Sequence, residues 1–274
     1  MHEISLAAEH IFSIGSFNVT NSMIVTVLIS ILVIVSAFLL RVKITTAKKI
    51  SKAQNTVEMV FEGAFSLMDG VTNNPKNSKR FFALVMTLFI FILLSNWSGL
   101  IPGVGSIGIH EEKEVVEQVE TVDHEALPEA VEAATEEGEH EETIFVPIFR
   151  APSSDLNTTI GLAIISLLSF QIFGIATIGF FKYLKKFLNF KGPIEFFLGI
   201  LEIVSEVAKM ISLSFRLFGN VFAGEVLLLV IAFLVPLIAP LPFFALEIFV
   251  GLIQAFIFAM LTLVFLTVAS MESH

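Results

Sequence analysis

An arginine lies in the middle of one of the most apolar parts of this chain, the stretch "SLSFRLFGNVFAGE" at residues 212–225. Arginine keeps its charge at every physiological pH, and at the centre of a bilayer it costs about 2.5–3.5 kcal/mol on insertion scales. A fixed positive charge in such surroundings favours the ionised form of a nearby carboxylate and repels a passing cation. Arg216 is therefore a candidate for ion chemistry inside a membrane.

Acidic and basic side chains recur along the same apolar region. Glu202, Lys209 and Arg216 are seven residues apart, and at 100° per residue they drift by only about 20° per step, so they share one helix face. Glu225 is nine residues beyond Arg216 and lies on roughly the opposite face, which argues against a static pair between the two. Glu247, in the next apolar segment, has no charged neighbour in sequence. Charges of both signs on different faces favour an ion path with a charged checkpoint.

Several of these polar residues also have a purely structural interpretation. Glu202, Glu206 and Lys209 could be ion-paired neighbours near a helix end that contribute little beyond the fold. Asn220 and Gln254 could simply hydrogen-bond across a pair of helices. Glu206 and Asn220 lie close to the face that carries the basic residues. Sequence spacing alone leaves both interpretations open.

The composition is that of a polytopic membrane protein. Of 274 residues, 55% are hydrophobic, 29 are Phe and only 15% are charged, which excludes an ordinary soluble domain. The absence of cysteine excludes disulfides and cysteine metal sites. No cofactor, metal or nucleic-acid partner is expected. The net charge of -10 belongs to one segment, because 14 of the 26 acidic residues lie between Glu111 and Glu142.

The elements that must position these residues form a single membrane domain over residues 1–274. Four or five apolar segments are long enough to cross about 30 Å of hydrocarbon, and the candidates span residues 23–40, 81–101, 156–181, 193–235 and 243–270. The fourth segment would reach about 65 Å as a helix, so it must tilt, bend or lie partly along the membrane plane. Prolines then turn the chain into the fifth segment, which makes the last two a long, steeply tilted helix hairpin.

Residues 53–75 carry apolar side chains at spacings of three and four, which predicts an amphipathic helix. It could lie in the membrane interface or pack on a partner subunit, and the pattern favours neither.

Basic residues orient the spans. Twelve of the 16 Lys and Arg residues fall in two loops on one side, which the positive-inside rule makes cytoplasmic. The N-terminal segment 1–22 and the loop 103–150, with its acidic insertion at 111–142, are then external, and the C-terminus is cytoplasmic. His110, His124 and His140 could form a metal or pH-sensing site in that loop, but a solvated insertion without tight metal spacing is the favoured interpretation.

Several motifs resemble one family closely. The stretches "SLSFRLFGNVFAGE" and "LIQAFIFAMLTLVFLTVAS", together with "NWSGLIPG" and "FRAPSSDLNTT", resemble subunit a of the F-type ATP synthases. The resemblance covers residues 81–270 apart from the acidic loop. It implies a bacterial plasma-membrane subunit without an active site of its own, which holds two offset proton half-channels against a rotating ring of c subunits, with b subunits of a peripheral stalk as further partners.

The resemblance also implies roles for individual positions. Arg216 matches the arginine that every rotor carboxylate must pass, and Gln254 matches the glutamine that faces it. Glu225 and Glu247 match the pair of half-channel positions that relay protons. The remaining matches are polar positions near the rotor-facing and exit paths: Glu202, Ser212 and Asn220. The family's aspartate near the end of the second span is Gly99 here, and the membrane segments contain no histidine, so an imidazole relay is excluded.

Two other classes of function fit the sequence less well. A self-contained secondary transporter predicts internal repeats with paired broken helices, and no repeat is visible. A structural scaffold would not place Arg216, Glu225 and Glu247 in apolar helices. The transported ion is expected to be a proton, with sodium as the alternative that the ring subunit would decide.

Overall fold

The computed structural model describes residues 8–15, 17–43, 52–101, 103–104, 107–112, 143–187, 192–236 and 238–271. Within these residues the chain forms seven α-helices, one short 3-10 helix and two two-stranded antiparallel sheets. Five of the helices are long and apolar enough to cross a bilayer. This confirms the predicted all-α polytopic membrane fold, although neither small sheet was predicted.

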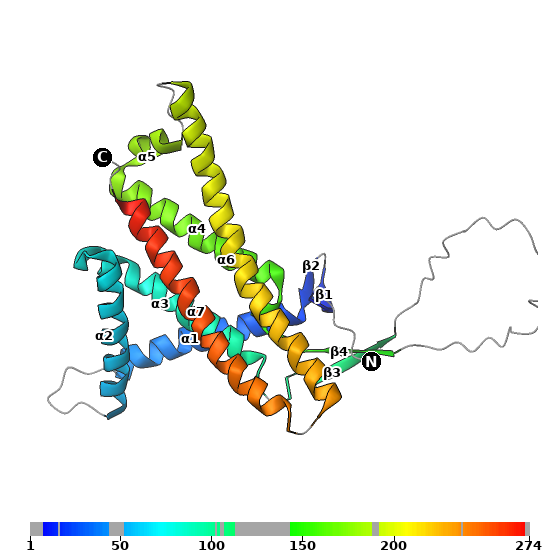
Figure 1. The fold of residues 1–274 in the computed structure, drawn as a ribbon. Helices are drawn as coiled ribbons and strands as arrows, with labels where there is room; N and C mark the ends of the chain where they lie inside the picture. The colour runs from blue at the N-terminus through cyan, green and yellow to red at the C-terminus, as the bar shows by residue number, and fades with distance from the viewer. Residues whose placement is uncertain are drawn as a thin grey trace, which may run out of the picture.

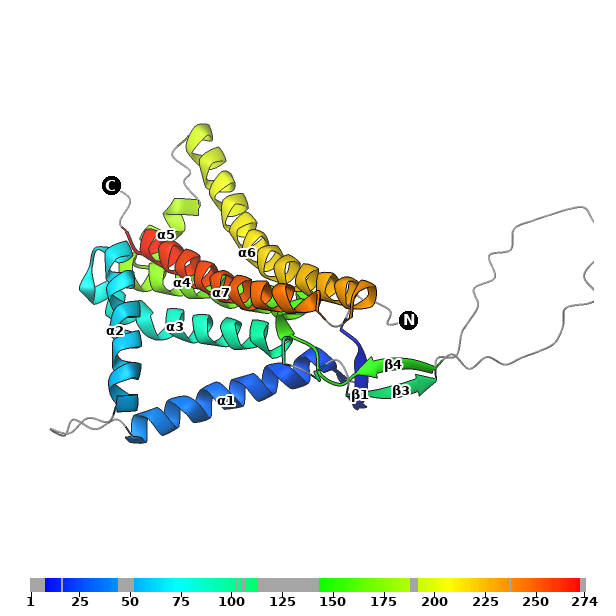
Figure 2. The ribbon, with the colours of Figure 1, turned by 60° about the horizontal axis from the view of Figure 1, so that its bottom comes forward.

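The five long helices are α1 (Asn21–Lys43), α3 (Pro75–Ser98), α4 (Leu156–Ile178), α6 (Pro193–Leu234) and α7 (Pro240–Ser270). The shorter elements are α2 (Lys52–Thr72), α5 (Phe180–Phe187) and the 3-10 turn η1 (Pro152–Ser154). The long fourth segment is one continuous helix of 42 residues. Helices α6 and α7 form an antiparallel hairpin (Figure 1), and α6 diverges from α7 toward its N-terminal end (Figure 2).

Capping residues explain where α2 ends and α3 begins. The side chain of Asn74 accepts hydrogen bonds from two backbone N–H groups of the first turn of α3, and Pro75 occupies the first helical position. Helix α3 therefore starts well before Phe81, where the apolar run begins. Asn73 has a φ of 49°, a left-handed conformation that no α-helix continues, so α2 ends at Thr72.

The third apolar segment, expected at 156–181, is interrupted. Helix α4 ends at Ile178, and Gly179 has a φ of 92°, a conformation that L side chains rarely adopt. The chain then changes direction into α5, which was not predicted. This break brings α5 back against α4 and the first part of α6.

The core lies where α3, α4 and α7 pack together, and it consists of two apolar clusters. One contains side chains of α2, α3, α4 and α7: Met68, Phe81, Val85, Phe170, Ala259, Leu263, Leu266 and Ala269. The other adds α6: Leu88, Ile92, Leu162, Ala163, Leu213, Leu217, Ala255 and Phe258. Hydroxyl pairs tie the same helices together, at 2.8 Å between Ser166 and Thr262 and at 3.2 Å between Thr159 and Ser214.

The helix ends gather at two opposite ends of the bundle. Helix α2, α5 and the C-terminal end of α7 lie at one end, here called the α2 end, whereas both small sheets and the end of α6 that meets α7 lie at the other, the sheet end (Figures 1 and 2). The sheets are β1–β2 (His10–Ile14 and Phe17–Thr20) and β3–β4 (Gly108–Glu112 and Thr143–Pro147). Glu111 and Glu112 of the acidic insertion end β3, and the rest of that insertion, with His124 and His140, lies outside the described residues.

The amphipathic helix α2 packs on this chain's own α3. Phe61 and Phe65 both contact the ring of Phe82, at centroid distances of 5.9 and 5.7 Å. Met68 is buried in the core, whereas Val60 is 56% exposed. The apolar stripe is thus largely satisfied within the subunit, and a place in the membrane interface remains a proposal.

Helix α1 is attached at the sheet end. Ser22 donates a hydrogen bond of 2.9 Å to the Asp155 carboxylate, and the Asn21 amide donates one of 3.2 Å to the carbonyl of Pro147. Asp155 also caps α4 by accepting from the backbone N–H of Asn157. In contrast, only 11% of the apolar stretch of α1 is buried inside the subunit.

Candidate functional site

Arg216 lies at the middle of α6 on an exposed face of that helix. Its neighbours Leu213 and Leu217 point the other way, into the core. Ser212 and Asn220, one turn to either side of Arg216, are exposed with it. Within the described part of the chain, Arg216 makes no hydrogen bond or ion pair, so its charge is available to a group outside this subunit.

Helix α7 contributes one amide to this region. The side-chain amide of Asn220 donates a hydrogen bond of 3.3 Å to Oε1 of Gln254, the cross-helix bond that the structural interpretation predicted. Gln254 is 3% exposed, and its Nε2 finds no acceptor among the described residues. The same pair therefore joins α6 to α7 one turn from Arg216 and retains one donor for another acceptor.

Glu225 meets residues from the segment before α4. The Ser154 side chain and the positive charge of Arg150 both act on the Glu225 carboxylate, while the Ser154 hydroxyl donates to the carbonyl of Ala151 at 2.9 Å. Arg150 in turn donates from Nε to Oγ of Ser154 at 3.2 Å. Glu225 is thus turned toward Arg150 and not toward Arg216, as its opposite helix face predicted.

The second relay candidate reaches the same place from α7. A Cβ added to Gly224 would overlap the Glu247 carboxylate, so that carboxylate lies directly against the backbone of α6, one residue from Glu225. The two acids also influence each other electrostatically. Two carboxylates from different helices, with a hydroxyl and a guanidinium beside one of them, can hold and exchange protons.

Gly99, where the resembled family has an aspartate, also borders this cluster. A Cβ at Gly99 would lie 2.8 Å from Cβ of Ala151 and 3.6 Å from Oε1 of Glu225. Any longer side chain would have to displace Ala151, so the local packing suits glycine. The position is close enough to Glu225 for an acid there to interact with it.

The end of α3 clamps α7 beside the acids. Asn96 donates a hydrogen bond of 2.9 Å to the carbonyl of Gly251, and the indole of Trp97 donates one of 3.0 Å to the carbonyl of Ile248. These bonds fix the helical turn that follows Glu247. Asn96 and Trp97 therefore position the cluster without being part of it.

The remaining candidates lie toward the α2 end. Glu202 is half-buried and fourteen residues from Arg216, about 21 Å along the helix, so the structure does not bring these two together. Lys209 forms an ion pair with Glu206 at 3.3 Å, as the structural interpretation predicted. However, the prediction that Glu206 lies close to the face of Arg216 is wrong, because Glu206 is buried at 7% exposure on the face that packs into the bundle.

Sequence analysis missed Arg150 and Ser154 as members of the site. Both belong to the stretch "FRAPSSDLNTT", which was recognised as a motif but had no chemical role assigned. The available signal was a basic residue just before an apolar span, in a segment that is otherwise uncharged until Asp155. Among the described residues, no three His, Asp or Glu side chains gather as metal ligands.

Comparisons with known proteins match most of this chain, including the residues of the candidate site. The sequence model of a family described as "ATP synthase A chain" matches residues 20–267. A protein of Campylobacter jejuni called ATP synthase subunit a is 34% identical over 226 residues, which cover 81% of this chain and 79% of that protein. Proteins of the same description from Campylobacter fetus and Moorella thermoacetica are 32% and 29% identical, with coverage of 100% and 93% of this chain and of 99% and 93% of their own lengths.

Proposed function

The chain belongs to the ATP synthase A chain family, and we propose that it is the stator that guides protons past the rotor of an F-type ATP synthase. Family membership supports a multi-pass membrane subunit that takes part in proton translocation without catalysing ATP formation itself. The finer proposal concerns Arg216, which would face the membrane carboxylates of a ring of c subunits. Two offset half-channels would connect that meeting point to opposite sides of the membrane.

The position of Arg216 is the observation that carries the proposal. A guanidinium on an exposed face of an apolar helix, with no partner in the described part of its own subunit, needs an acidic partner from elsewhere. A rotor carboxylate is stable as an ion opposite this charge and stable as a neutral acid against lipid. Loss and gain of the proton thus become separate events on the two sides of the arginine.

The acids at the sheet end support an external half-channel. Glu225 and Glu247 would pass protons between the external solution and the rotor carboxylate, with Arg150 and Ser154 as neighbours of Glu225. Gln254 would face Arg216 from α7, and Asn220 would hold its side chain through their hydrogen bond. A proton that falls through 100 mV releases about 2.3 kcal/mol, which would drive each step of the ring.

On the other side, Ser212 and Glu202 would line the exit path along the rotor-facing surface of α6. Both are accessible on that helix, and they lie between Arg216 and the α2 end. Under this proposal the α2 end and the C-terminus are cytoplasmic, the sheet end is external, and b subunits of the peripheral stalk hold the subunit still. The two basic regions between spans, which contain α2 and α5, support this orientation.

The decisive experiment replaces Arg216. In membrane vesicles that carry the assembled complex, Arg216→Ala should abolish ATP-driven proton pumping, measured by the quenching of a pH-sensitive dye. Arg80→Ala is a matched control, since that guanidinium already has partners in Thr177 at 3.0 Å and the Phe173 ring at 4.9 Å, and it should keep pumping. Near-normal pumping by Arg216→Ala would show that proton translocation does not require Arg216, which contradicts the proposed function.

A further inference from the structure

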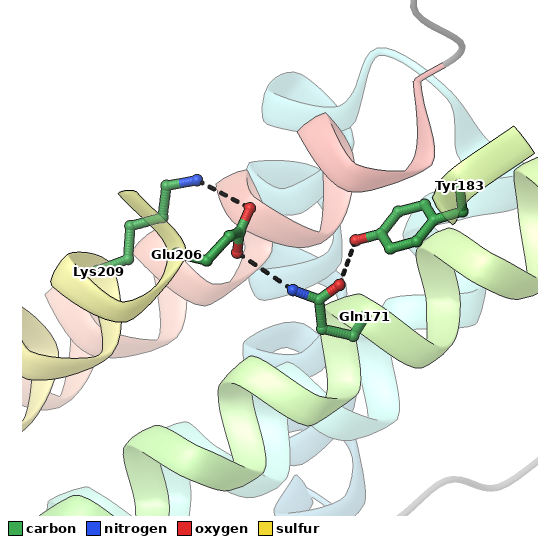
Figure 3. Close-up of polar contacts among 4 residues, drawn as sticks. All are labelled: Gln171, Tyr183, Glu206 and Lys209. Atoms are coloured by element: carbon green, nitrogen blue, oxygen red, sulfur yellow. Dashed lines mark hydrogen bonds and ion pairs between the residues drawn. The ribbon is translucent and has the colours of Figure 1, made fainter. Parts of the chain in front are cut away.

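Four residues from three helices form a hydrogen-bonded chain around a buried acid near the α2 end. Nζ of Lys209 lies 3.3 Å from Oε1 of Glu206, and the amide of Gln171 donates to Oε2 of Glu206 at 3.4 Å. The hydroxyl of Tyr183 donates to Oε1 of Gln171 at 2.5 Å. Figure 3 shows these side chains converging from α4, α5 and α6.

The direction of these bonds makes the chain a fixed support for Glu206. Burial raises the pKa of Tyr183 to about 12, and the charges of Glu206 and Glu202 add to the effect, so the phenol remains a donor at physiological pH. The amide of Gln171 then turns its own donor toward Glu206. Because a neutral amide does not release protons at such pH, the chain holds the carboxylate without offering a path for protons.

Local packing holds the far end of this chain in place. A Cβ added to Gly174 would lie 2.6 Å from Cε2 of Tyr183, so the tyrosine ring occupies space that only glycine leaves open. Tyr183 is 5% exposed. Tyr183 of α5 therefore fixes the Gln171 amide of α4, which presents its donor to Glu206 of α6.

Lys209 is the one other cation of α6 besides Arg216, and it lies seven residues from it, about 10 Å along the helix axis. Spacing alone would place both on the same face. In the structure, however, Nζ of Lys209 also lies 5.4 Å from the centre of the Phe265 ring of α7. The ammonium group is therefore drawn toward the bundle, while Arg216 has no partner within the described residues.

We propose that Glu206 is a positioning residue that neutralises Lys209 and holds its ammonium group away from the rotor, so that Arg216 is the sole uncompensated cation on the rotor-facing side of α6. This inference rests on the proposed function of Arg216. Consider a rotor carboxylate opposite Arg216, with a second free cation about 10 Å away. At an effective dielectric constant of 20, this cation would shift the ionisation equilibrium of the carboxylate toward the ionised form by about tenfold. It would compete with Arg216 for the carboxylate and retain it at the wrong position.

The test compares Glu206→Gln with the double variant Glu206→Gln/Lys209→Gln in vesicles that carry the assembled complex. ATP-driven pumping per assembled complex should fall about threefold to tenfold in Glu206→Gln, because Lys209 is then uncompensated. The double variant should recover to within about twofold of wild type, since it removes the competing charge along with its counterion. A purely structural role for Glu206 predicts no such recovery.

Gln171→Leu is the matched control, because it removes the α4 donor but leaves the ion pair between Glu206 and Lys209 intact. It should pump close to the wild-type rate. The proposal is overturned by wild-type pumping in Glu206→Gln, by equal loss in the single and double variants, by failure of both to assemble, or by a loss in Gln171→Leu as large as in Glu206→Gln. The proposed function has its own test in Arg216→Ala, in which Glu206 and Lys209 are unchanged, so the two can fail separately.

Discussion

Glu206 and Glu225 are two acids of the same helix, and both are turned into the bundle, but their surroundings differ. Glu206 accepts a hydrogen bond from Gln171 at one oxygen and contacts Lys209 of its own helix at the other. Glu225 lies beside a hydroxyl and a guanidinium from the segment before α4. A second carboxylate, that of Glu247, approaches from α7.

This difference separates a carboxylate that is held by dedicated partners from one that lies beside a second carboxylate. Two carboxylates close together share protons readily. A buried acid in a membrane helix is therefore not by itself evidence of a proton path. Whether a buried acid belongs to a proton path depends on the groups that face it. In this chain those groups differ between the α2 end and the sheet end.

Replacing Glu225 should have the largest effect. Glu225→Gln keeps the shape but cannot carry a proton, so coupled proton transport should fall by about tenfold or more while the complex still assembles. The rate of ATP-driven acidification per assembled complex measures this. In contrast to Glu206, a second substitution should not restore transport, so Glu225→Gln/Arg150→Gln should remain as slow as Glu225→Gln. Recovery of transport in this double variant would contradict the proposed difference between the two acids.

Glu247→Gln should also slow transport without preventing assembly, by a factor similar to that of Glu225→Gln. The same vesicles and the same normalisation apply. Full activity in both single variants would show that the assignment of the relay is wrong.

A smaller effect is expected from Gly224→Ala. The added methyl group must displace the Glu247 carboxylate, and a shift of this size should slow transport by about threefold to tenfold. Gly161→Ala is the matched control, because a Cβ there meets nothing within 4 Å. Equal rates for the two variants would mean that the position of the Glu247 carboxylate does not matter.

Tyr183→Phe should affect stability more than transport. Loss of the hydrogen bond to Gln171 should cost about 1 kcal/mol and lower the temperature at which vesicles lose pumping. Because the pKa of Tyr183 is raised to about 12, its hydroxyl is protonated at both pH 7 and pH 9, and the difference from wild type should be the same at both. That contribution is fully present below the unfolded pKa of 10.0 and is lost as the pH rises from there through about 12. A difference that disappears at pH 9 would contradict this.

The smallest effect is expected from removing the acidic insertion. Glu112 pairs with Thr143 at the end of the β3–β4 sheet, so residues 113–142 can be replaced by Asn-Gly, which suits a two-residue hairpin turn. ATP synthesis in such vesicles should stay within about twofold of wild type, as expected for a surface insertion. Loss of coupling with normal assembly would give the insertion a role in supplying protons to Glu225.

The apolar segments predicted the five spans because hydrophobic length is a direct requirement of the bilayer. The rotation of each helix was less predictable, since side chains that face lipid and side chains that face the core are both apolar. This is why Glu206 was placed close to the face of Arg216 when it belongs to the buried one. The break at Gly179 was missed because the apolar run continues through it.

The partners of Glu225 were beyond the reach of sequence spacing. Arg150 and Ser154 lie in a segment between spans, and only the fold brings them to Glu225 in the last part of α6. Periodicity describes which residues share a face of one helix, but contacts between distant segments depend on how the helices pack. The resemblance to a known family supplied Glu225 and Glu247, whereas it supplied no role for these two neighbours.

The attachment of α1 has a consequence for the order of synthesis. Asn21 and Ser22 bond to Pro147 and Asp155, which follow them by 126 and 133 residues. Helix α1 is apolar enough to remain inserted by itself, but its first turn has these partners only after the segment before α4 has been translated and has crossed to the same side. During biogenesis α1 can therefore pack against α3 early, but its first turn gains these bonds only once more than half of the chain has been made.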